Sequence, residues 1–394
     1  MRITFITNKL NLAGGGENQD VFMKSQTLQA KGHEVSVVTT FSKFNNISAV
    51  VPFAITEEWA QSERLFPLQA FIVRILKKHS PRTDVFYLVG TTFLFGAGWY
   101  RLFKKNSKPI IADINGHADF VEAYFKKPPL WPVGSLAYEK SLWQSLKHRI
   151  RIFLERLIGV RLLNNFDAIV IMTKTLAGYY IRAGVRPDKI TVIPSFQDII
   201  AFQNQPLQNN PFSQYPKNAF HILFTGRLYI DKGADILIDA LAKFSRPDCI
   251  LHIVGEGEQK SELVKRVREL GLASVIKFYP WQSLHDLAGF YQHAHLFVHP
   301  GRLPEPLVRT TIEAMAFGLP LIVTDTSVEK WLAQEVAKVF KLGDSADLAA
   351  KIMDAYQDKQ WQKAAAINGR QRALNFDFRG LIPLLDRTII EATK

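Results

Sequence analysis

Two patterns of hydrophobic positions alternate along this chain. Short apolar runs rich in β-branched residues are separated by longer stretches in which apolar residues recur every three or four positions. Short runs bounded by turn residues predict buried strands, and the longer stretches predict amphipathic helices. Their alternation indicates a parallel sheet with helices on both faces. In the first half of the chain the short runs lie at 2–7, 34–40, 84–90, 109–113, 167–172 and 189–194.

The alternation stops between residues 194 and 219, where the sequence is irregular and rich in Pro, Asn and Gln. Such a stretch is typical of a connection between domains. Beyond it the alternation resumes, so the sequence predicts an α/β fold of two facing Rossmann-like domains, each a doubly wound parallel sheet. Ligands of such sheets bind beyond the carboxyl ends of the strands, so we expect the site in a cleft between the domains. The expected parts are an N-terminal domain at 1–197, a linker at 198–218, a C-terminal domain at 219–375 and a C-terminal helix at 376–394.

Composition narrows the class of protein. The 394 residues are 47% hydrophobic and 22% charged, which is the balance of a folded protein with two domains of ordinary size. Cys249 is the only cysteine, which excludes an internal disulfide and a cysteine metal cluster and favours the reducing cytoplasm. No uncharged apolar run reaches the roughly 18 residues of a transmembrane helix. We therefore expect a cytoplasmic protein whose contact with a membrane is at most peripheral.

The net charge of +13 is spread unevenly. Residues 101–160 hold 11 Lys or Arg against 5 Asp or Glu, and from 126 to 160 the basic residues alternate with aromatic and aliphatic ones. Two interpretations stay open for 126–160: a helix resting on an anionic membrane surface, or a solvated basic helix over the core. The chain has no helix-turn-helix, zinc-finger or ribonucleoprotein signature, so we expect no nucleic-acid partner.

The stretch EPLVRTTIEAMAFG at 305–318 holds two glutamates around a predicted helix. Pro306 suits its first position and Gly318 its end. Glu305 then lies at the helix N-terminus, where it either meets a ligand or only caps the helix. Glu313 lies within the apolar run and needs hydrogen-bond donors, which ligand hydroxyls would supply. The free amides of the helix end suit an anion such as a diphosphate.

Three further segments follow predicted strands. GRLYIDKG at 226–233 offers Arg227 and Lys232 to an anion, although Arg and Lys in a turn usually contact only water. NLAGGGENQ at 11–19 brings three glycines to the start of a helix, without the Gly-x-Gly-x-x-Gly spacing of a dinucleotide site. His117 in ADINGHADF could act as a base or bind a sugar hydroxyl, but a single loop histidine is more often structural.

Together and in this order, these segments resemble the retaining GT-B glycosyltransferases of family four. Gly15 and Gly16 lead through one helix to KGHEVSVVT, as in the GG loop of that family. FTGRLYIDKG resembles its Gly-Arg-Leu to Lys-Gly segment, and EPLVRTTIEAMAFGLPLI resembles its Glu-(seven residues)-Glu motif. FDFRGLIPLLDRTIIEA resembles the C-terminal helix that crosses back to the first domain.

The resemblance implies a nucleotide-sugar donor held mainly by the C-terminal domain and an acceptor held mainly by the N-terminal domain. Arg227 and Lys232 would neutralise the departing diphosphate without a metal ion, and the chain contains no Asp-x-Asp pair. Glu313 would bind the ribose, Glu305 the hydroxyls of the transferred sugar, and His117 the sugar near its reacting carbon.

The resemblance also implies that the Gly15–Gly16 loop closes on the phosphates and the acceptor, and that the anomeric configuration is kept. Leu307 and Val308 stand where the family usually has a small or aromatic pair ending in glycine. We expect a UDP-sugar donor, with GDP-mannose next, and a lipid-linked or polysaccharide acceptor in cell-surface glycan synthesis. A catalytically silent relative that only binds sugars is the alternative, and the missing dinucleotide fingerprint argues against an oxidoreductase.

Overall fold

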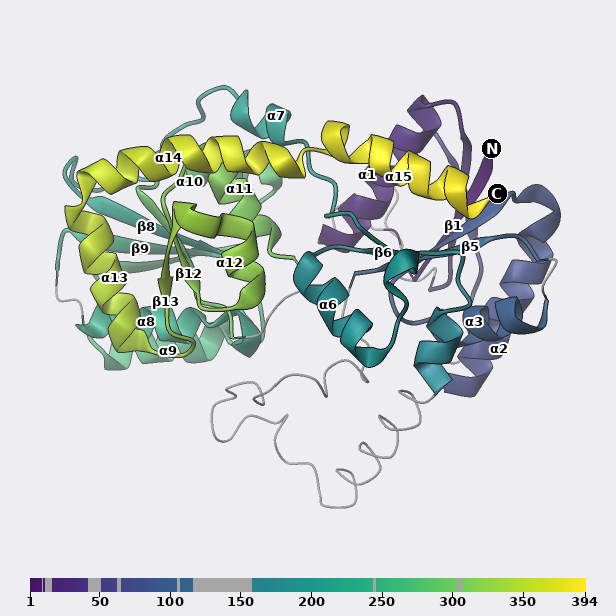
Figure 1. Ribbon diagram of the computed structural model, residues 1–394. Coiled ribbons are helices and arrows are strands. Elements are labelled where there is room, and N and C mark those ends of the chain that lie inside the picture. The colour runs from purple at the N-terminus through teal and green to yellow at the C-terminus, as the bar shows by residue number, and fades with distance from the viewer. Residues whose placement is uncertain are drawn as a thin grey trace, which may run out of the picture. The chain divides into compact units, whose positions relative to one another are not determined.

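The computed structural model describes residues 1–8, 10, 16–41, 51–61, 65–104, 107–115, 158–243, 246–302 and 307–394 (Figure 1). The chain forms two compact units. Unit 1 comprises the described residues up to Gln197 together with Phe378–Lys394, and unit 2 comprises Asp198–Asp377. Unit 2 is therefore inserted into unit 1. No helix of the described residues is long and apolar enough to cross a membrane.

Among the described residues the chain passes from one unit to the other at two places, and hydrogen bonds join them. Within unit 1, the amide of Phe378 donates to the carbonyl oxygen of Gln197 at 3.0 Å. Within unit 2, the amide of Ile200 donates to the carboxylate of Asp377 at 3.2 Å. The ends of the inserted unit therefore lie next to each other.

Unit 1 contains a seven-stranded parallel sheet of order β3-β2-β1-β4-β5-β6-β7. Residue Ile3 of the inner strand β1 pairs with Val35 of β2 on one side and with Val85 of β4 on the other. Six of the seven strands fall on the apolar runs predicted above. The strands are β1 (Arg2–Thr7), β2 (Glu34–Thr39), β3 (Ala54–Glu57), β4 (Val85–Val89), β5 (Ile110–Ile114), β6 (Ala168–Ile171) and β7 (Ile190–Val192).

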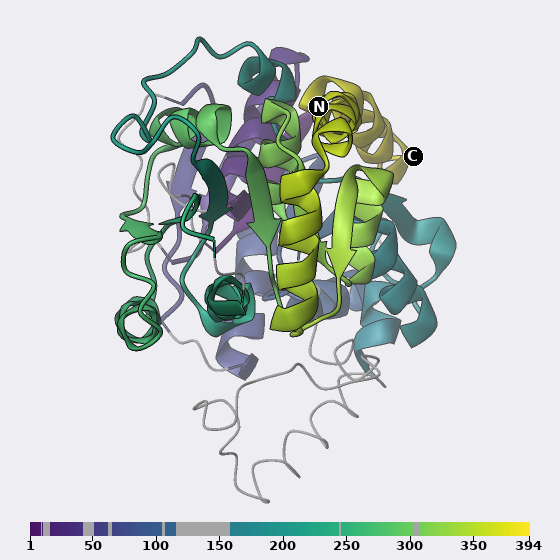
Figure 2. The same cartoon turned by 90° about the vertical axis from the view of Figure 1, so that its left-hand side faces the viewer.

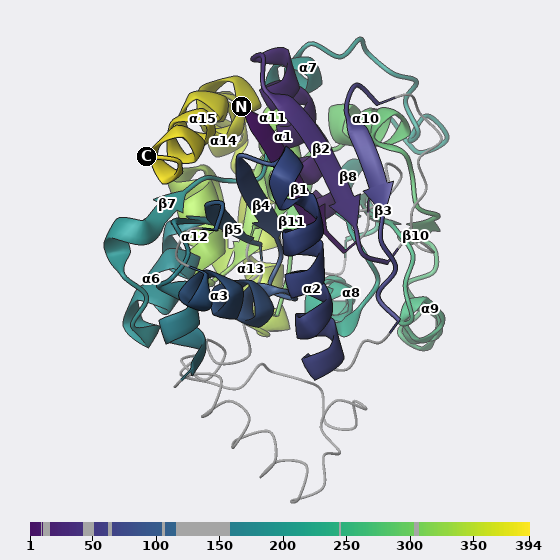
Figure 3. The same ribbon diagram turned by 90° about the vertical axis from the view of Figure 1, so that its right-hand side faces the viewer.

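Side chains alternate between the two faces of this sheet, as the period of a strand requires. Ile6 packs with α2 (Leu65–His79), α3 (Leu94–Phe103) and α6 (Lys174–Ala183) on one face. Phe5 packs with α1 (Gly16–Ala30) and α15 (Phe378–Ala392) on the other (Figures 1 and 3). The described part of unit 1 also contains the short 3₁₀ helices η2 (Ser80–Arg82) and η3 (Pro187–Lys189).

Unit 2 contains a six-stranded parallel sheet of order β10-β9-β8-β11-β12-β13, also covered on both faces (Figures 1 and 2). Its strands are β8 (Phe220–Thr225), β9 (Cys249–Val254), β10 (Ile276–Tyr279), β11 (Leu296–His299), β12 (Leu321–Thr324) and β13 (Ala337–Phe340). Its α-helices are α7 (Ile199–Gln203), α8 (Ala234–Lys243), α9 (Lys260–Glu269), α10 (Leu284–His293), α11 (Arg309–Phe317), α12 (Ser327–Ala333), α13 (Ser345–Gln357) and α14 (Lys359–Ala373). Its 3₁₀ helices are η4 (Ile230–Lys232), η5 (Gln334–Val336) and η6 (Leu374–Phe376). The prediction of two doubly wound parallel sheets is confirmed.

Local sequence signals set several helix ends. Thr173 caps α6 by accepting a hydrogen bond from the amide of Leu176 at 3.1 Å, and Gly184 ends the same helix in the left-handed conformation. Asp198 caps α7, so the segment expected as an irregular linker at 198–218 begins with a short helix and belongs to unit 2. The predicted C-terminal helix begins at Phe378 and packs in unit 1.

Candidate functional site

The loops that follow β8 and β9 run in close contact at the carboxyl end of the unit 2 sheet. A Cβ atom on Gly255 would come within 1.9 Å of the carbonyl oxygen of Gly226, and one on Gly257 within 2.4 Å of that of Leu228. Gly226 and Gly255 also have φ values of 155° and 151°. Glycine is required at such approaches because a side chain would push the loops apart. The backbone of 226–228 is thus supported from behind by 255–257.

The loop after β11 packs against the same turn. Gly233, with φ 69°, follows η4, and a Cβ atom there would lie 2.1 Å from the carbonyl oxygen of Pro300. The amide of Arg302 donates to the carbonyl oxygen of Asp231 at 2.8 Å. The buried guanidinium of Arg302 donates to the carbonyl oxygen of Ile230 and to Asp235 Oδ1, both at 2.7 Å. These bonds hold the loops after β8 and β11 as one body.

Arg227 and Lys232 both lie on this turn. The Arg227 side chain is exposed, and its guanidinium lies 5.0 Å from the centre of the Tyr229 ring. The Lys232 side chain is only 12% exposed, and its Nζ lies 3.7 Å from Asp231 Oδ2. The structure therefore places both cations at the carboxyl end of β8, on a turn whose backbone is fixed by neighbouring loops.

Glu313 is buried in α11 and connects to the same strand end. The hydroxyl of Tyr291, in α10, donates to Glu313 Oε2 at 3.0 Å. Thr225 Oγ1, at the end of β8, lies 2.9 Å from that hydroxyl. Burial raises the pKa of Glu313, while Arg309 and the Tyr291 hydrogen bond act against the rise. The chain Glu313–Tyr291–Thr225 leads to the residue that precedes Gly226, so the glutamate and the turn with both cations meet at one strand end.

Helix α11 starts three residues later than expected. The prediction that Pro306 is its first residue is wrong, because the helix begins at Arg309. Val308 is extended at φ −97° and ψ 97°, and no side chain caps the helix. Leu307 and Val308 are buried, so they enter the core as extended backbone instead of opening the helix.

Several expected site residues lie outside the described residues. These residues are Glu305, His117 and Gly15. Most of the basic segment 126–160 also lies outside the described residues. Gly16 is described and is the first residue of α1. Among the described residues, no group of three His, Cys, Asp or Glu side chains could hold a metal ion.

Sequence reasoning missed a second buried carboxylate near this edge. His299 ends β11, and its Nδ1 lies 2.6 Å from Oε1 of Glu329 in α12, with both side chains almost fully buried. Thr311, in α11, donates its hydroxyl to the same oxygen at 3.3 Å. Gly301 packs over the histidine ring, since a Cβ atom there would lie 2.7 Å from His299 Cε1. Its position in the sequence could have indicated this histidine, because His299 lies at the end of a buried strand, close to where Arg227 lies relative to β8.

The carboxyl end of the unit 1 sheet gathers a separate polar group. A Cβ atom on Gly90, after β4, would lie 3.6 Å from both Glu17 Oε1 of α1 and Asn115 Oδ1 after β5. Asn8, after β1, donates its side-chain amide to the hydroxyl of Thr92 at 2.9 Å. The first turn of α1 therefore lies beside Gly90 and Asn115, at the ends of β4 and β5.

A buried ion cluster fixes α1 in that position. Lys24 Nζ lies 2.7 Å from Asp113 Oδ2 in β5 and 2.7 Å from Asp20 Oδ2 in its own helix. Tyr87 donates its hydroxyl to Asp113 Oδ2 at 2.9 Å, and the amide of Phe196 donates to Asp20 Oδ1 at 2.6 Å. Burial opposes the charge of Lys24, but the two carboxylates outweigh it and raise its pKa. The cluster joins α1, the end of β5 and the segment before the crossing at Gln197.

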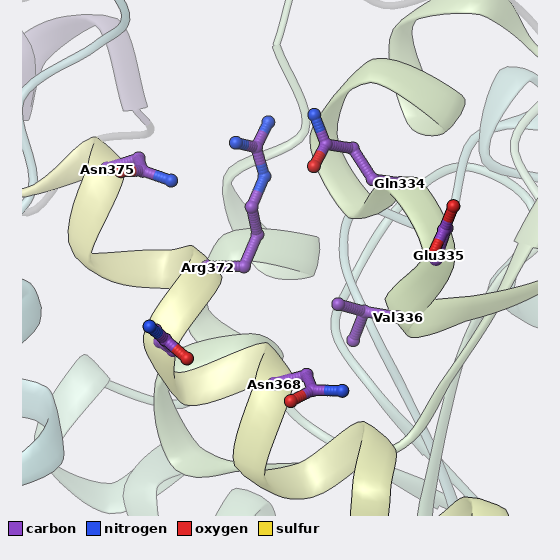
Figure 4. A pocket seen from close by; sticks show the side chains of 7 residues that line it. Gln334, Glu335, Val336, Asn368, Arg372 and Asn375 are labelled. Atoms are coloured by element: carbon purple, nitrogen blue, oxygen red, sulfur yellow. The ribbon is translucent and has the colours of Figure 1, made fainter.

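A hollow of about 600 Å³ lies elsewhere in unit 2, between η5 and the end of α14 (Figure 4). Arg372 fixes one wall by donating to the carbonyl oxygens of Leu332 and Trp331 at 3.0 and 2.8 Å, which caps the end of α12. Arg227, Lys232 and Glu313 do not line it. Its lining residues are Gln334, Glu335, Val336, Asn368, Gln371, Arg372 and Asn375. We therefore place the candidate site at the strand ends and not in this hollow.

Two protein-family models match the chain. The model described as Glycosyltransferase Family 4 matches residues 14–199, and the model described as Glycosyl transferases group 1 matches residues 208–372. The boundary between the matches falls at the start of unit 2. The second match contains all the strand-end loops of unit 2 described above.

Curated relatives are similar over part of their length. Mannosylfructose-phosphate synthase of Agrobacterium fabrum is 38% identical over 113 residues, which are 26% of this chain and 25% of that protein. The lipopolysaccharide core biosynthesis glycosyltransferase LpsE of Rhizobium meliloti is 27% identical over 158 residues, covering 40% of this chain and 45% of the relative. The chain thus spans less than half the length of either relative.

Solved structures are similar over nearly the whole chain. HepE of Anabaena, in a complex with UDP-glucose, superposes with a TM-score of 0.72 at 20% identity. The superposition covers 98% of this chain and 99% of that one. At this identity the likeness shows a shared fold.

Proposed function

This chain belongs to the GT-B glycosyltransferases of family four, and we propose that it transfers a sugar from a nucleoside-diphosphate sugar to a lipid-linked or polysaccharide acceptor. We propose a UDP-sugar as the donor, with GDP-mannose second. The crystal complex of HepE with UDP-glucose supports the first choice, and the name of LpsE supports an acceptor in cell-surface glycan synthesis. The site of transfer would be the cytoplasmic side of a membrane.

One observation carries the proposal: two cations lie on a turn that is held rigidly at the end of β8. Arg227 and Lys232 lie on 226–233, Arg302 ties this turn to the loop after β11, and Glu313 is joined through Tyr291 to the preceding Thr225. Preorganised positive charge stabilises a leaving group most when it does not have to rearrange during the reaction. The turn supplies such charge to a diphosphate.

The roles of the remaining residues follow from this arrangement as parts of the proposal. Arg227 and Lys232 neutralise the departing diphosphate, so that transfer needs no metal ion. Glu313 accepts hydrogen bonds from the ribose, and Glu305 binds the hydroxyls of the transferred sugar. His117 contacts the sugar near its reacting carbon, and the Gly15–Gly16 loop approaches the phosphates and the acceptor. The acceptor attacks on the face from which the diphosphate leaves, so the anomeric configuration is kept.

The first test is the shift in thermal unfolding caused by UDP, GDP, ADP and NAD, each with a metal chelator present. A ligand at 100 times its dissociation constant stabilises the folded state by about 2.7 kcal/mol, which is easily measured. We expect UDP to give the largest shift, and turnover of the matching nucleotide sugar in chelator then tests metal independence. No shift with any nucleotide would favour the catalytically silent relative, and a shift with NAD alone would overturn the proposal.

A further inference from the structure

The helices on the two faces of the unit 1 sheet differ in charge. Helices α1 and α15, on one face, together hold four Asp or Glu and three Lys or Arg. Helices α2, α3 and α6, on the other face, hold no Asp or Glu at all (Figures 1 and 3). Their six basic residues are Arg74, Lys77, Lys78, Arg101, Lys174 and Arg182. The charged residues of α2, α3 and α6, called the basic layer below, are therefore all basic apart from the terminal His79.

Most of this charge is displayed outwards. Arg74, Lys77, Lys174 and Arg182 are exposed. Two of the six basic residues pair with carboxylates outside the layer, namely Lys78 with Glu58 at 2.6 Å and Arg101 with Asp167 at 2.6 Å. Lys78 remains 65% exposed despite its partner. An exposed surface with this charge attracts an anionic partner.

The same layer exposes large apolar side chains. On α3, Trp99 and Phe103 are one helical turn apart and stack with ring centres 5.3 Å apart and planes at 13°. They are 44% and 71% exposed, and Leu102 between them is 43% exposed. The opposite side of α3 is buried at Ala97 and Tyr100, so these side chains have no place in the core. The exposed Lys104 follows directly after the helix.

We propose that the basic layer docks on a bilayer that contains anionic phospholipids, with Trp99, Leu102 and Phe103 entering the headgroup region. Aromatic side chains prefer the headgroup depth, and the exposed Lys and Arg of the basic layer would bind anionic headgroups. The absence of acidic residues from all three helices favours this partner over a mixed protein surface. The inference deepens the proposed function, because a lipid-linked acceptor has to be met at such a surface.

Co-sedimentation with lipid vesicles tests the docking. The intact chain is mixed with vesicles of phosphatidylcholine alone and with vesicles in which part of it is replaced by phosphatidylglycerol. We expect binding only to the second kind, falling as salt is raised, because salt screens the attraction between exposed charges. The affinity of the variant Trp99→Ala/Phe103→Ala for these vesicles should be lower by about tenfold or more, since this variant loses the inserted apolar surface. The matched control Trp281→Ala removes a tryptophan that is 61% exposed in unit 2 and should bind as the wild type does.

Three outcomes would overturn the inference. The wild type would fail to bind anionic vesicles, or the double variant would bind as well as the wild type with unchanged circular dichroism. In the third outcome, the wild type would self-associate in a concentration-dependent way and the double variant would not, which would identify a second copy of the chain as the partner.

A Lys77→Glu/Arg182→Glu variant tests the contribution of charge separately from that of the aromatic rings, and it should also weaken binding to anionic vesicles. Vesicle binding without turnover of any nucleotide sugar would refute the proposed function and leave the docking intact.

Discussion

Replacing Gly233 with alanine tests whether the turn that carries Lys232 is held by close backbone contact. Gly233 has φ 69°, and an added Cβ atom would lie 2.1 Å from the carbonyl oxygen of Pro300. Gly271, after α9, has nearly the same φ of 68° but no atom within 4 Å of an added Cβ. The two variants therefore share the cost of a left-handed alanine and differ only in the clash.

The magnitudes follow from these distances. Forcing alanine into the left-handed region costs about 1 kcal/mol at either position. In Gly233→Ala the loops after β8 and β11 must also separate by about 1 Å, and overpacking of that kind costs about 1–3 kcal/mol more. The same shift moves Lys232 and lengthens the Arg302–Ile230 hydrogen bond, which is 2.7 Å long. A displacement of about 1 Å at a reacting group lowers turnover by roughly 100-fold.

Urea unfolding and donor turnover of both variants provide the assay. We expect Gly271→Ala to lose about 1 kcal/mol of unfolding free energy with normal turnover. Gly233→Ala should lose about 2–4 kcal/mol and most of its turnover. Equal destabilisation of the two variants would refute the close contact. A strong loss of stability in Gly233→Ala with normal turnover would refute its role in holding the site.

Three further predictions address the charges of unit 2. Arg227→Ala and Lys232→Ala should each reduce turnover about 100-fold, as removal of one preorganised donor does, and near-normal initial rates in both would contradict the diphosphate role. Glu313→Gln should keep the Tyr291 hydrogen bond but weaken nucleotide binding, measured by calorimetry; unchanged affinity would disprove the ribose contact. His221 and His252 share a hydrogen bond of 3.0 Å in the core, and burial lowers their pKa values from 6.5 to about 4 and about 3. The unfolded chain therefore binds more protons below pH 6.5, so stability should fall as the pH drops from 6.5 towards 4. Urea midpoints should show a smaller fall in the variant with phenylalanine at both positions, and an identical fall would exclude this cause.

The strands were predictable where burial on both faces gave them a continuous apolar sequence. Strand β4 (Val85–Val89) is buried along its whole length, and its continuous apolar sequence predicted it. Strand β3 (Ala54–Glu57) was missed, because it is a short edge strand whose end residues are exposed and whose sequence has no such run. The start of α11 was placed three residues too early, because the sequence shows the helix-compatible Pro306 but not the burial of Val308 in extended backbone.

The placement of candidate residues was predictable where they follow a strand. Arg227 and Lys232 lie at the end of β8 as expected, and Glu313 is buried as its apolar sequence context indicated, while their roles stay predictions. Arg302 was missed because its partner Asp235 comes from a helix 67 residues away in the chain, and no spacing in the sequence indicates the pair. The contact between His299 and Glu329 likewise depends on the fold, which brings α12 back to the end of the sheet.

The adjacency of the two chain crossings gives the molecule a modular construction. The chain passes into unit 2 after Gln197 and returns to unit 1 at Phe378, and these two residues are hydrogen-bonded to each other. A segment whose ends lie together can be excised, and the gap closed by a short linker, without rearranging the host sheet. Among the described residues, 198–377 thus leave and rejoin unit 1 at a single place. Replacing 198–377 by the corresponding part of another chain would therefore test which properties of the protein each unit carries by itself.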